Sequence, residues 1–134
     1  MTHLSCVGRD GKTRVFDYQV QISSSGDNYT FKVRTVPPMK SDDFFELELE
    51  KLDTNTVCVI MAHHHNKPEY AAKGIPEALL PEVKRKLEMN VESSPMDGKQ
   101  NNVFRTPAAT KYWERLVATN GAIYDNLRDV YTVV

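Results

Sequence analysis

The chain has 134 residues, and its 17 basic and 18 acidic side chains leave a formal net charge of -1. One domain is expected at this length, and 40% hydrophobic with 26% charged residues excludes a charge-rich disordered chain. The near-neutral balance also removes the broad electrostatic attraction that is typical of nucleic-acid-binding proteins.

No apolar run approaches the roughly 18 residues that a membrane span needs, and the first residues lack the basic segment and apolar core of a signal peptide. The two cysteines, Cys6 and Cys58, are far apart and match no zinc-binding or disulfide pattern. We therefore expect a cytoplasmic protein with reduced thiols.

Alternating apolar and polar residues predict strands in the first half, at residues 16–22, 29–34 and 45–50. Small and polar residues at 23–28 predict a turn between the first two strands. Residues 57–62 differ because they are continuously apolar, which is typical of a strand buried on both faces. We expect them to form the central strand of the sheet, with helices covering it on each side.

The pattern changes to helical spacing in the second half. It predicts one helix with Pro76 in its first turn and a second helix that Thr106 caps. Residues 89–94 predict a short strand between the helices, and residues 122–124 and 130–133 predict a closing hairpin. The expected fold class is α+β: a single domain over residues 1–134, with a mixed, mostly antiparallel central sheet of about seven strands and two helices.

The junction between the central strand and the first helix, residues 66–80, has the clearest functional signal. A strand that leads through a glycine-bearing loop into a helix N-terminus presents free backbone amides and the positive end of the helix dipole. Such an arrangement can bind phosphate. The alternative is a plain strand-to-helix connection in which Gly74 only makes a tight turn.

The same stretch resembles the pyrophosphate-binding segment of the GCN5-related N-acetyltransferases, which has the pattern P-E-Y-[QR]-G-K-G-[IV]-G-x-A-L-L. The residues that match this pattern are Pro68, Glu69, Tyr70, Lys73, Gly74, Ile75, Ala78, Leu79 and Leu80. The second helix is similar to a later segment of the family through Ala109, Tyr112, Glu114, Arg115 and Leu116. The resemblance covers about residues 56–118, and the first 40 residues show no motif.

The resemblance implies a truncated acyl-CoA N-acyltransferase fold that uses acetyl-CoA to acetylate an unidentified amine. It implies that the pantetheine arm of the cofactor pairs with the main chain of Met61, Ala62 and His63. It also implies that the pyrophosphate is bound by the loop formed by Ala71, Ala72, Lys73, Gly74 and Ile75.

An amine must lose a proton before it attacks a thioester, so the reaction needs a base. The candidates are Glu50, on a strand expected beside the central one, and His64, just beyond the central strand. A carboxylate on a solvated strand face is the alternative explanation of Glu50. The family's usual general acid falls at Trp113, and because an indole cannot protonate a thiolate, the adjacent Tyr112 is the candidate acid.

The chain also departs from the family pattern. Ala71 and Pro76 occupy two of the three positions of the family's phosphate-binding signature, and Pro76 removes a backbone amide. Together with Trp113, these residues favour an alternative function: a non-catalytic protein of the same fold that binds or inhibits a protein partner through an exposed sheet edge and the acidic residues 42–53. An unrelated α+β module is a third interpretation. Exposed edge strands would also allow a homodimer.

The run of His63, His64 and His65 raises the question of a metal site, since imidazole is a common metal ligand. Consecutive residues of an extended chain point to opposite sides, so three in a row chelate one ion poorly. We therefore predict no physiological metal.

Overall fold

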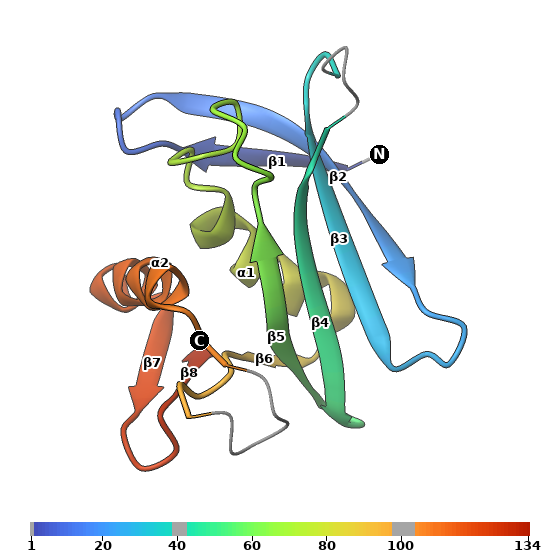
Figure 1. The fold of residues 1–134 in the computed structure, drawn as a ribbon, viewed down its shortest axis with the longest axis vertical. Coiled ribbons are helices and arrows are strands. Elements are labelled where there is room, and N and C mark those ends of the chain that lie inside the picture. The colour runs from blue at the N-terminus through green and yellow to red at the C-terminus, as the bar shows by residue number, and fades with distance from the viewer. Residues whose placement is uncertain (1, 39–42, 98–103) are drawn as a thin grey trace.

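A computed structural model of the chain describes residues 2–38, 43–97 and 104–134. In chain order its elements are β1 (Thr2–Val7), β2 (Thr13–Ile22), β3 (Asn28–Thr35), β4 (Phe45–Asp53), β5 (Thr56–His63), α1 (Ile75–Leu87), β6 (Asn90–Glu92), α2 (Pro107–Ala118), β7 (Ala122–Asp125) and β8 (Val130–Val133). The strands form one curled sheet in the order β1-β2-β3-β4-β5-β6-β8-β7 (Figure 1). The α+β class and the mixed, mostly antiparallel sheet are thus confirmed.

The strand β1 is the main addition to the predicted fold, and it brings the described sheet to eight strands rather than about seven. It pairs antiparallel with β2 at the end of the sheet, and Leu4 and Cys6 point into the core. Asp10 and Gly11 lie in the turn that joins the two strands. An Asp-Gly pair between alternating apolar residues is a strong hairpin signal, so the sequence held evidence for this strand.

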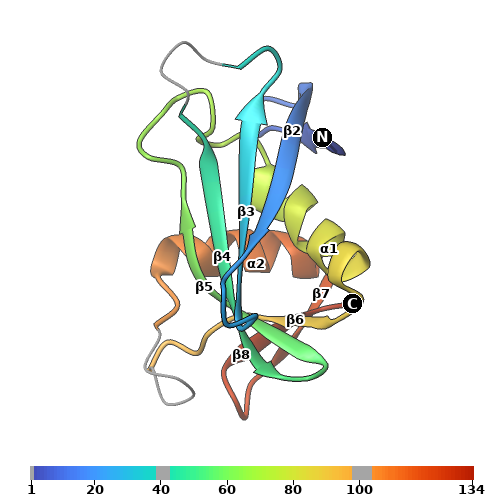
Figure 2. The ribbon, with the colours of Figure 1, turned by 90° about the vertical axis from the view of Figure 1, so that its right-hand side faces the viewer.

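The central strand β5 is buried along only part of its length, which corrects the prediction. Val57, Cys58 and Val59 are buried, whereas Ala62 and His63 are exposed. The helices do not cover both faces either: α1 lies behind the sheet, and α2 lies beside the free edge of β5 (Figures 1 and 2). The reason is that β5 pairs with β6 over a few residues at its start, and the two chain segments then separate.

Both helices begin as the sequence predicts. Helix α1 starts after Gly74, whose φ of 76° lies in the left-handed region, and continues through Pro81. Helix α2 is capped by Thr106, whose hydroxyl oxygen accepts a hydrogen bond from the backbone N–H of Ala109 at 3.1 Å. Neither helix needs partner strands to be recognised, because capping and apolar spacing are local properties of the chain.

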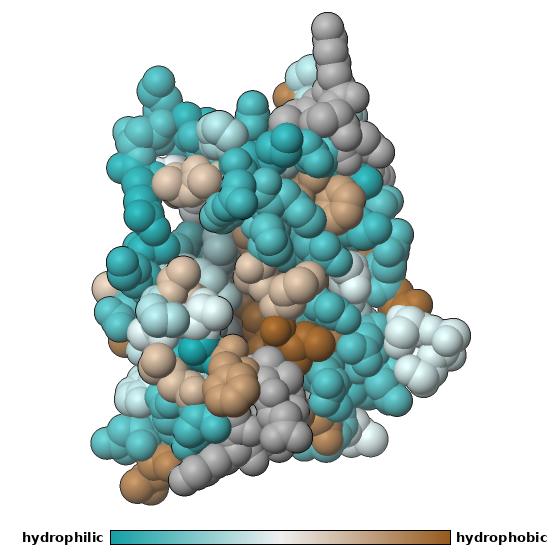
Figure 3. All heavy atoms as spheres, in the orientation of Figure 1, coloured by the Kyte–Doolittle hydropathy of each residue, from teal (hydrophilic) through white to brown (hydrophobic). Residues whose placement is uncertain are grey.

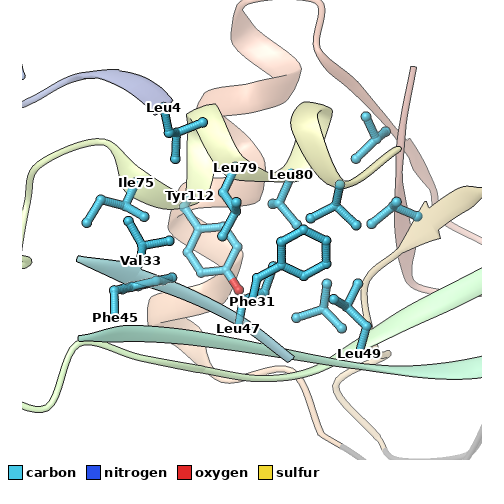
Figure 4. Packing of buried hydrophobic residues seen from close by; sticks show 14 of the residues in the cluster. Leu4, Phe31, Val33, Phe45, Leu47, Leu49, Ile75, Leu79, Leu80 and Tyr112 are labelled. Atoms are coloured by element: carbon cyan, nitrogen blue, oxygen red, sulfur yellow. The ribbon is translucent and has the colours of Figure 1, made fainter. Parts of the chain in front are cut away.

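One hydrophobic core joins the inner face of the sheet to both helices (Figure 4). Its largest fully buried side chains include Trp113, Tyr18, Tyr70, Phe16, Phe31, Leu47, Leu49, Ile75, Leu79 and Leu80. Trp113 is 1% exposed and stacks on Tyr131 of β8, with 5.8 Å between ring centroids. This stacking fixes α2 against the C-terminal hairpin and leaves its other side facing β5.

Candidate functional site

A cleft of about 730 Å³ opens where β5 and β6 separate. In the described residues the two strands pair in parallel at Thr56–Cys58 and Asn90–Glu92. Beyond that point the cleft is lined by β5, by α2, by the segment that leads into α1, and by the end of β1. Its volume is within the range of roughly 300–1,000 Å³ that is usual for small-molecule sites. In Figure 3 apolar side chains gather over and beside β5 on an otherwise mostly hydrophilic face.

The floor of the cleft is held by two polar residues that the sequence analysis did not select. The hydroxyl of Ser94 donates to the carbonyl of Val59 at 2.8 Å, just where β5 and β6 part. Arg105, 6% exposed, donates to the carbonyl of Ser94 and forms an ion pair with Asp129 at 2.8 Å. Its Nε also donates to Thr110 of α2 at 2.8 Å. These bonds tie the loop after β6 to β5, to the turn before β8 and to α2, so the floor has a defined shape.

Backbone amides line the wall of the cleft at the start of α1. Among the described residues, the N–H groups from Ala72 to Ile75 have no hydrogen-bond acceptor, and no side chain caps the helix at Gly74. Ala72, Lys73 and Gly74 line the cleft, but Ile75 does not and is fully buried in the core. The next residue, Pro76, lines the cleft but has no backbone N–H to donate. The wall can therefore offer free donors from three residues.

The residues that match the family pattern have structural roles of their own. Tyr70 is 2% exposed, and its hydroxyl donates to the carbonyl of Asp43 at 2.5 Å, which anchors the loop to the chain before β4. A Cβ on Gly74 would lie 2.0 Å from the carbonyl oxygen of Val7, so glycine is required there by the close approach of β1. Lys73 is the matched residue with a charged side chain among those that line the cleft, and it also lines a second cavity beside Glu69. Tyr70 and Gly74 are thus explained by the structure of the loop itself, through a hydrogen bond and a close backbone contact.

The charged side chains around the cleft are mostly basic. Arg9, Lys73, Arg105 and Arg115 line it against a single lining carboxylate, Glu77. Arg115 pairs with Glu77 at 2.9 Å across the two helices. Within the described part of the chain, the guanidinium of Arg9 and the ammonium of Lys73 have no ion-pair or hydrogen-bond partner. A positive cleft in a chain of net charge -1 favours an anionic ligand.

His64 lines the cleft, as the hypothesis of a base requires. Its Nδ1 accepts a hydrogen bond from the backbone N–H of Asn66 at 3.0 Å. A ring nitrogen that accepts has no proton, so the neutral imidazole holds its proton on Nε2. In this form Nε2 of His64 is a hydrogen-bond donor, and Nδ1 is already occupied by the Asn66 amide.

Tyr112 also lines the cleft, but its ring reaches from α2 into the core and its hydroxyl points toward the sheet (Figure 4). Burial raises the pKa of Tyr112 well above its ordinary value, and the charge of Glu77 raises it further. The hydroxyl therefore stays protonated and is a weak acid.

Glu50 is not among the residues that line the cleft. It lies on β4 opposite Cys58, in register with the paired start of β5 rather than with its free end. Glu46, Glu48 and Glu50 alternate with the buried Phe45, Leu47 and Leu49, so the three carboxylates share the face of β4 turned away from the core. Asp42, the first of the predicted acidic residues, lies outside the described residues.

The predicted contacts of the pantetheine arm are divided. Met61 and Ala62 line the cleft, whereas His63 does not. Nδ1 of His63 accepts the backbone N–H of His65 at 2.6 Å, and the two imidazole rings stack with 4.4 Å between centroids. Ala71, predicted as part of the pyrophosphate-binding loop, lines the cleft beside Ala72.

In the described chain, no group of three or more His, Cys, Asp or Glu residues is arranged to hold a metal ion. Its helices are too short or too polar to cross a membrane. Searches of protein-family models and of curated proteins find no match to this sequence.

Proposed function

We propose that this chain binds acetyl-CoA in the cleft between β5 and β6 and transfers its acetyl group to an amine. The main support is the set of phosphate-compatible groups at one wall of the cleft: unpaired amides at the N-terminus of α1 beside the unpartnered cations Arg9 and Lys73. The similarity of residues 66–80 to the pyrophosphate-binding segment of the acetyltransferases points the same way.

The free edge of β5 is the second support. Beyond Cys58, β5 has no strand partner on its β6 side among the described residues, so peptide groups near Met61 and Ala62 are available to an extended ligand. An extended amide-containing chain can hydrogen-bond to such an edge as an added strand would. The apolar side chains beside β5 would shield that chain from water.

Acetyl-CoA would supply an activated acyl thioester. The protein's own contributions would be to hold the phosphates at Lys73 and the α1 amides, to align the ligand along β5, and to exclude water with Tyr112 and Phe45. His64 would donate a hydrogen bond from Nε2, and it would serve as a base only after Nδ1 releases the Asn66 amide.

The first test is calorimetric titration with acetyl-CoA and with desulfo-CoA, because affinity does not depend on the unknown amine. We expect micromolar binding that Lys73→Ala weakens by about five- to tenfold. Lys111→Ala is the matched control, since Lys111 is an exposed cation of α2 that does not line the cleft. Absence of binding at millimolar ligand would contradict the proposal.

The second candidate function is a protein that binds acetyl-CoA in the same cleft without catalysing acetyl transfer. It is favoured by the raised pKa of Tyr112 and by the hydrogen bond that occupies Nδ1 of His64. The two candidates differ in the release of the free thiol of CoA, which accompanies acetyl transfer. To measure it, the wild-type chain is incubated with acetyl-CoA and a panel of amines that includes polyamines and peptide N-termini. Thiol release above the uncatalysed rate supports the transferase, whereas tight binding of acetyl-CoA with only uncatalysed thiol release for every amine supports the binding protein.

A further inference from the structure

The turn between β1 and β2 forms part of the cleft, although it lies far from the α1 loop in the sequence. Val7, Gly8 and Arg9 line the cleft together with the loop residues before α1. The backbone N–H of Arg9 donates to the carbonyl of Ala72 at 3.1 Å. The Arg9 side chain therefore starts directly beside the loop that presents free amides.

This turn is held rigidly by its own hydrogen bonds. The carboxylate of Asp10 accepts from the guanidinium of Arg14 at 2.7 and 3.2 Å and from the backbone N–H of Lys12 at 3.0 Å. The N–H of Gly8 donates to the carbonyl of Lys12 at 2.9 Å. The charges of Asp10 and Arg14 are thus satisfied by each other, and Arg9 is left as the unpaired cation on the cleft side of the turn.

We infer that Arg9 is a phosphate-binding residue, which the β1–β2 turn adds to the site from outside the loop before α1. The inference rests on the proposed function in so far as the ligand is a coenzyme A thioester. A guanidinium suits this role because its planar fork of donors matches two oxygens of a phosphate group. Because the turn is already fixed, the backbone that carries Arg9 need not become ordered when a ligand binds.

Coenzyme A offers two kinds of phosphate, a pyrophosphate bridge and a 3′-phosphate, and a comparison of ligands separates them. Arg9→Ala is titrated calorimetrically with CoA and with dephospho-CoA, which lacks the 3′-phosphate. We expect CoA to bind about tenfold more weakly to Arg9→Ala than to the wild type. If dephospho-CoA is unaffected, Arg9 contacts the 3′-phosphate; if both ligands lose affinity equally, it contacts the pyrophosphate.

Lys12→Ala is the matched control because it removes one positive charge from the same turn, at a residue that is exposed and does not line the cleft. It should change affinity less than about twofold, and Arg9→Lys should restore only part of the loss. Equal small effects of Arg9→Ala and Lys12→Ala on CoA binding would overturn the inference while leaving the proposed function standing. Unchanged thermal unfolding of each variant shows that the fold is intact.

Failure of the proposed function gives a different result, because the wild type then does not bind CoA. In that case the same variants are titrated with inorganic pyrophosphate. Binding that is lost in Arg9→Ala and kept in Lys12→Ala supports the phosphate role of Arg9 for another ligand. No binding of pyrophosphate by the wild type overturns the inference together with the proposed function.

Discussion

Replacing Gly74 with alanine should destabilise the fold far more than the same change at Gly26. The two glycines have nearly the same left-handed φ, 76° and 78°, so alanine meets similar backbone strain at both. A Cβ on Gly74 would lie 2.0 Å from the carbonyl oxygen of Val7, whereas nothing lies within 4 Å of a Cβ on Gly26. Comparing the two variants therefore separates the loss of stability caused by the close approach of β1 from the loss caused by the φ angle.

The expected magnitudes follow from these two terms. Left-handed backbone costs alanine about 1–2 kcal/mol, and its reduced freedom in the unfolded chain offsets about 0.4–1 kcal/mol of that. Gly26→Ala should lower the free energy of unfolding by about 1 kcal/mol. At Gly74 the end of β1 must also move away, which adds an overpacking cost of about 1–3 kcal/mol and loosens the hydrogen bond from Arg9 to Ala72. We expect a total of about 3 kcal/mol.

Thermal unfolding measures the difference. The entropy of unfolding is about 2.1 cal/mol/K per residue. For a chain of 134 residues, this entropy corresponds to a Tm shift of about 3.5 °C per kcal/mol of stability. Tm should fall by about 4 °C in Gly26→Ala and by about 10 °C in Gly74→Ala. Equal shifts would refute the proposed contact between Gly74 and Val7. A larger substitution such as Gly74→Glu would displace β1 as well as add a negative charge, so loss of CoA binding in that variant would not by itself report on a phosphate site.

Acid should weaken the floor of the cleft. Burial alone would raise the pKa of Asp129, but hydrogen bonds, first among them that from Arg105, outweigh it and lower the pKa to about 2. Asp129 therefore contributes stability that is present above about pH 4 and lost as the pH falls toward 2. Asp129→Asn should remove this part of the pH dependence of the free energy of unfolding, measured in urea. A pH profile equal to that of the wild type would contradict the prediction. Thr106→Ala should cost about 1 kcal/mol because its hydroxyl caps α2, whereas Thr106→Ser should keep most of the stability, as urea unfolding can measure. Burial raises the pKa of the Cys6 thiol to about 12, and Cys58 is buried too. A chromogenic disulfide reagent at about pH 8 should therefore label neither cysteine in the native chain and both after unfolding. Rapid labelling of the native chain would contradict this prediction.

The site was predicted less completely than the elements that form it. Sequence pattern directed attention to Lys73 and to the loop around it, and both line the cleft. Arg9, Ser94 and Arg105 were missed, because nothing in the spacing of a lone arginine or serine shows which distant segment it will meet. The Asp-Gly pair after β1 could have revealed the hairpin that brings Arg9 to the cleft, but not the contact with the α1 loop.

The sequence by itself determined the local structure: the alternating strands β2 to β4, the capped helix α2, the start of α1 and the closing hairpin. These follow from periodicity and capping, which act between residues a few positions apart. Only the tertiary structure decided that β5 and β6 separate after a short paired stretch and that the end of β1 lies against Gly74. Both depend on contacts between segments distant in the chain, where packing and backbone hydrogen bonding, rather than local preference, select the arrangement.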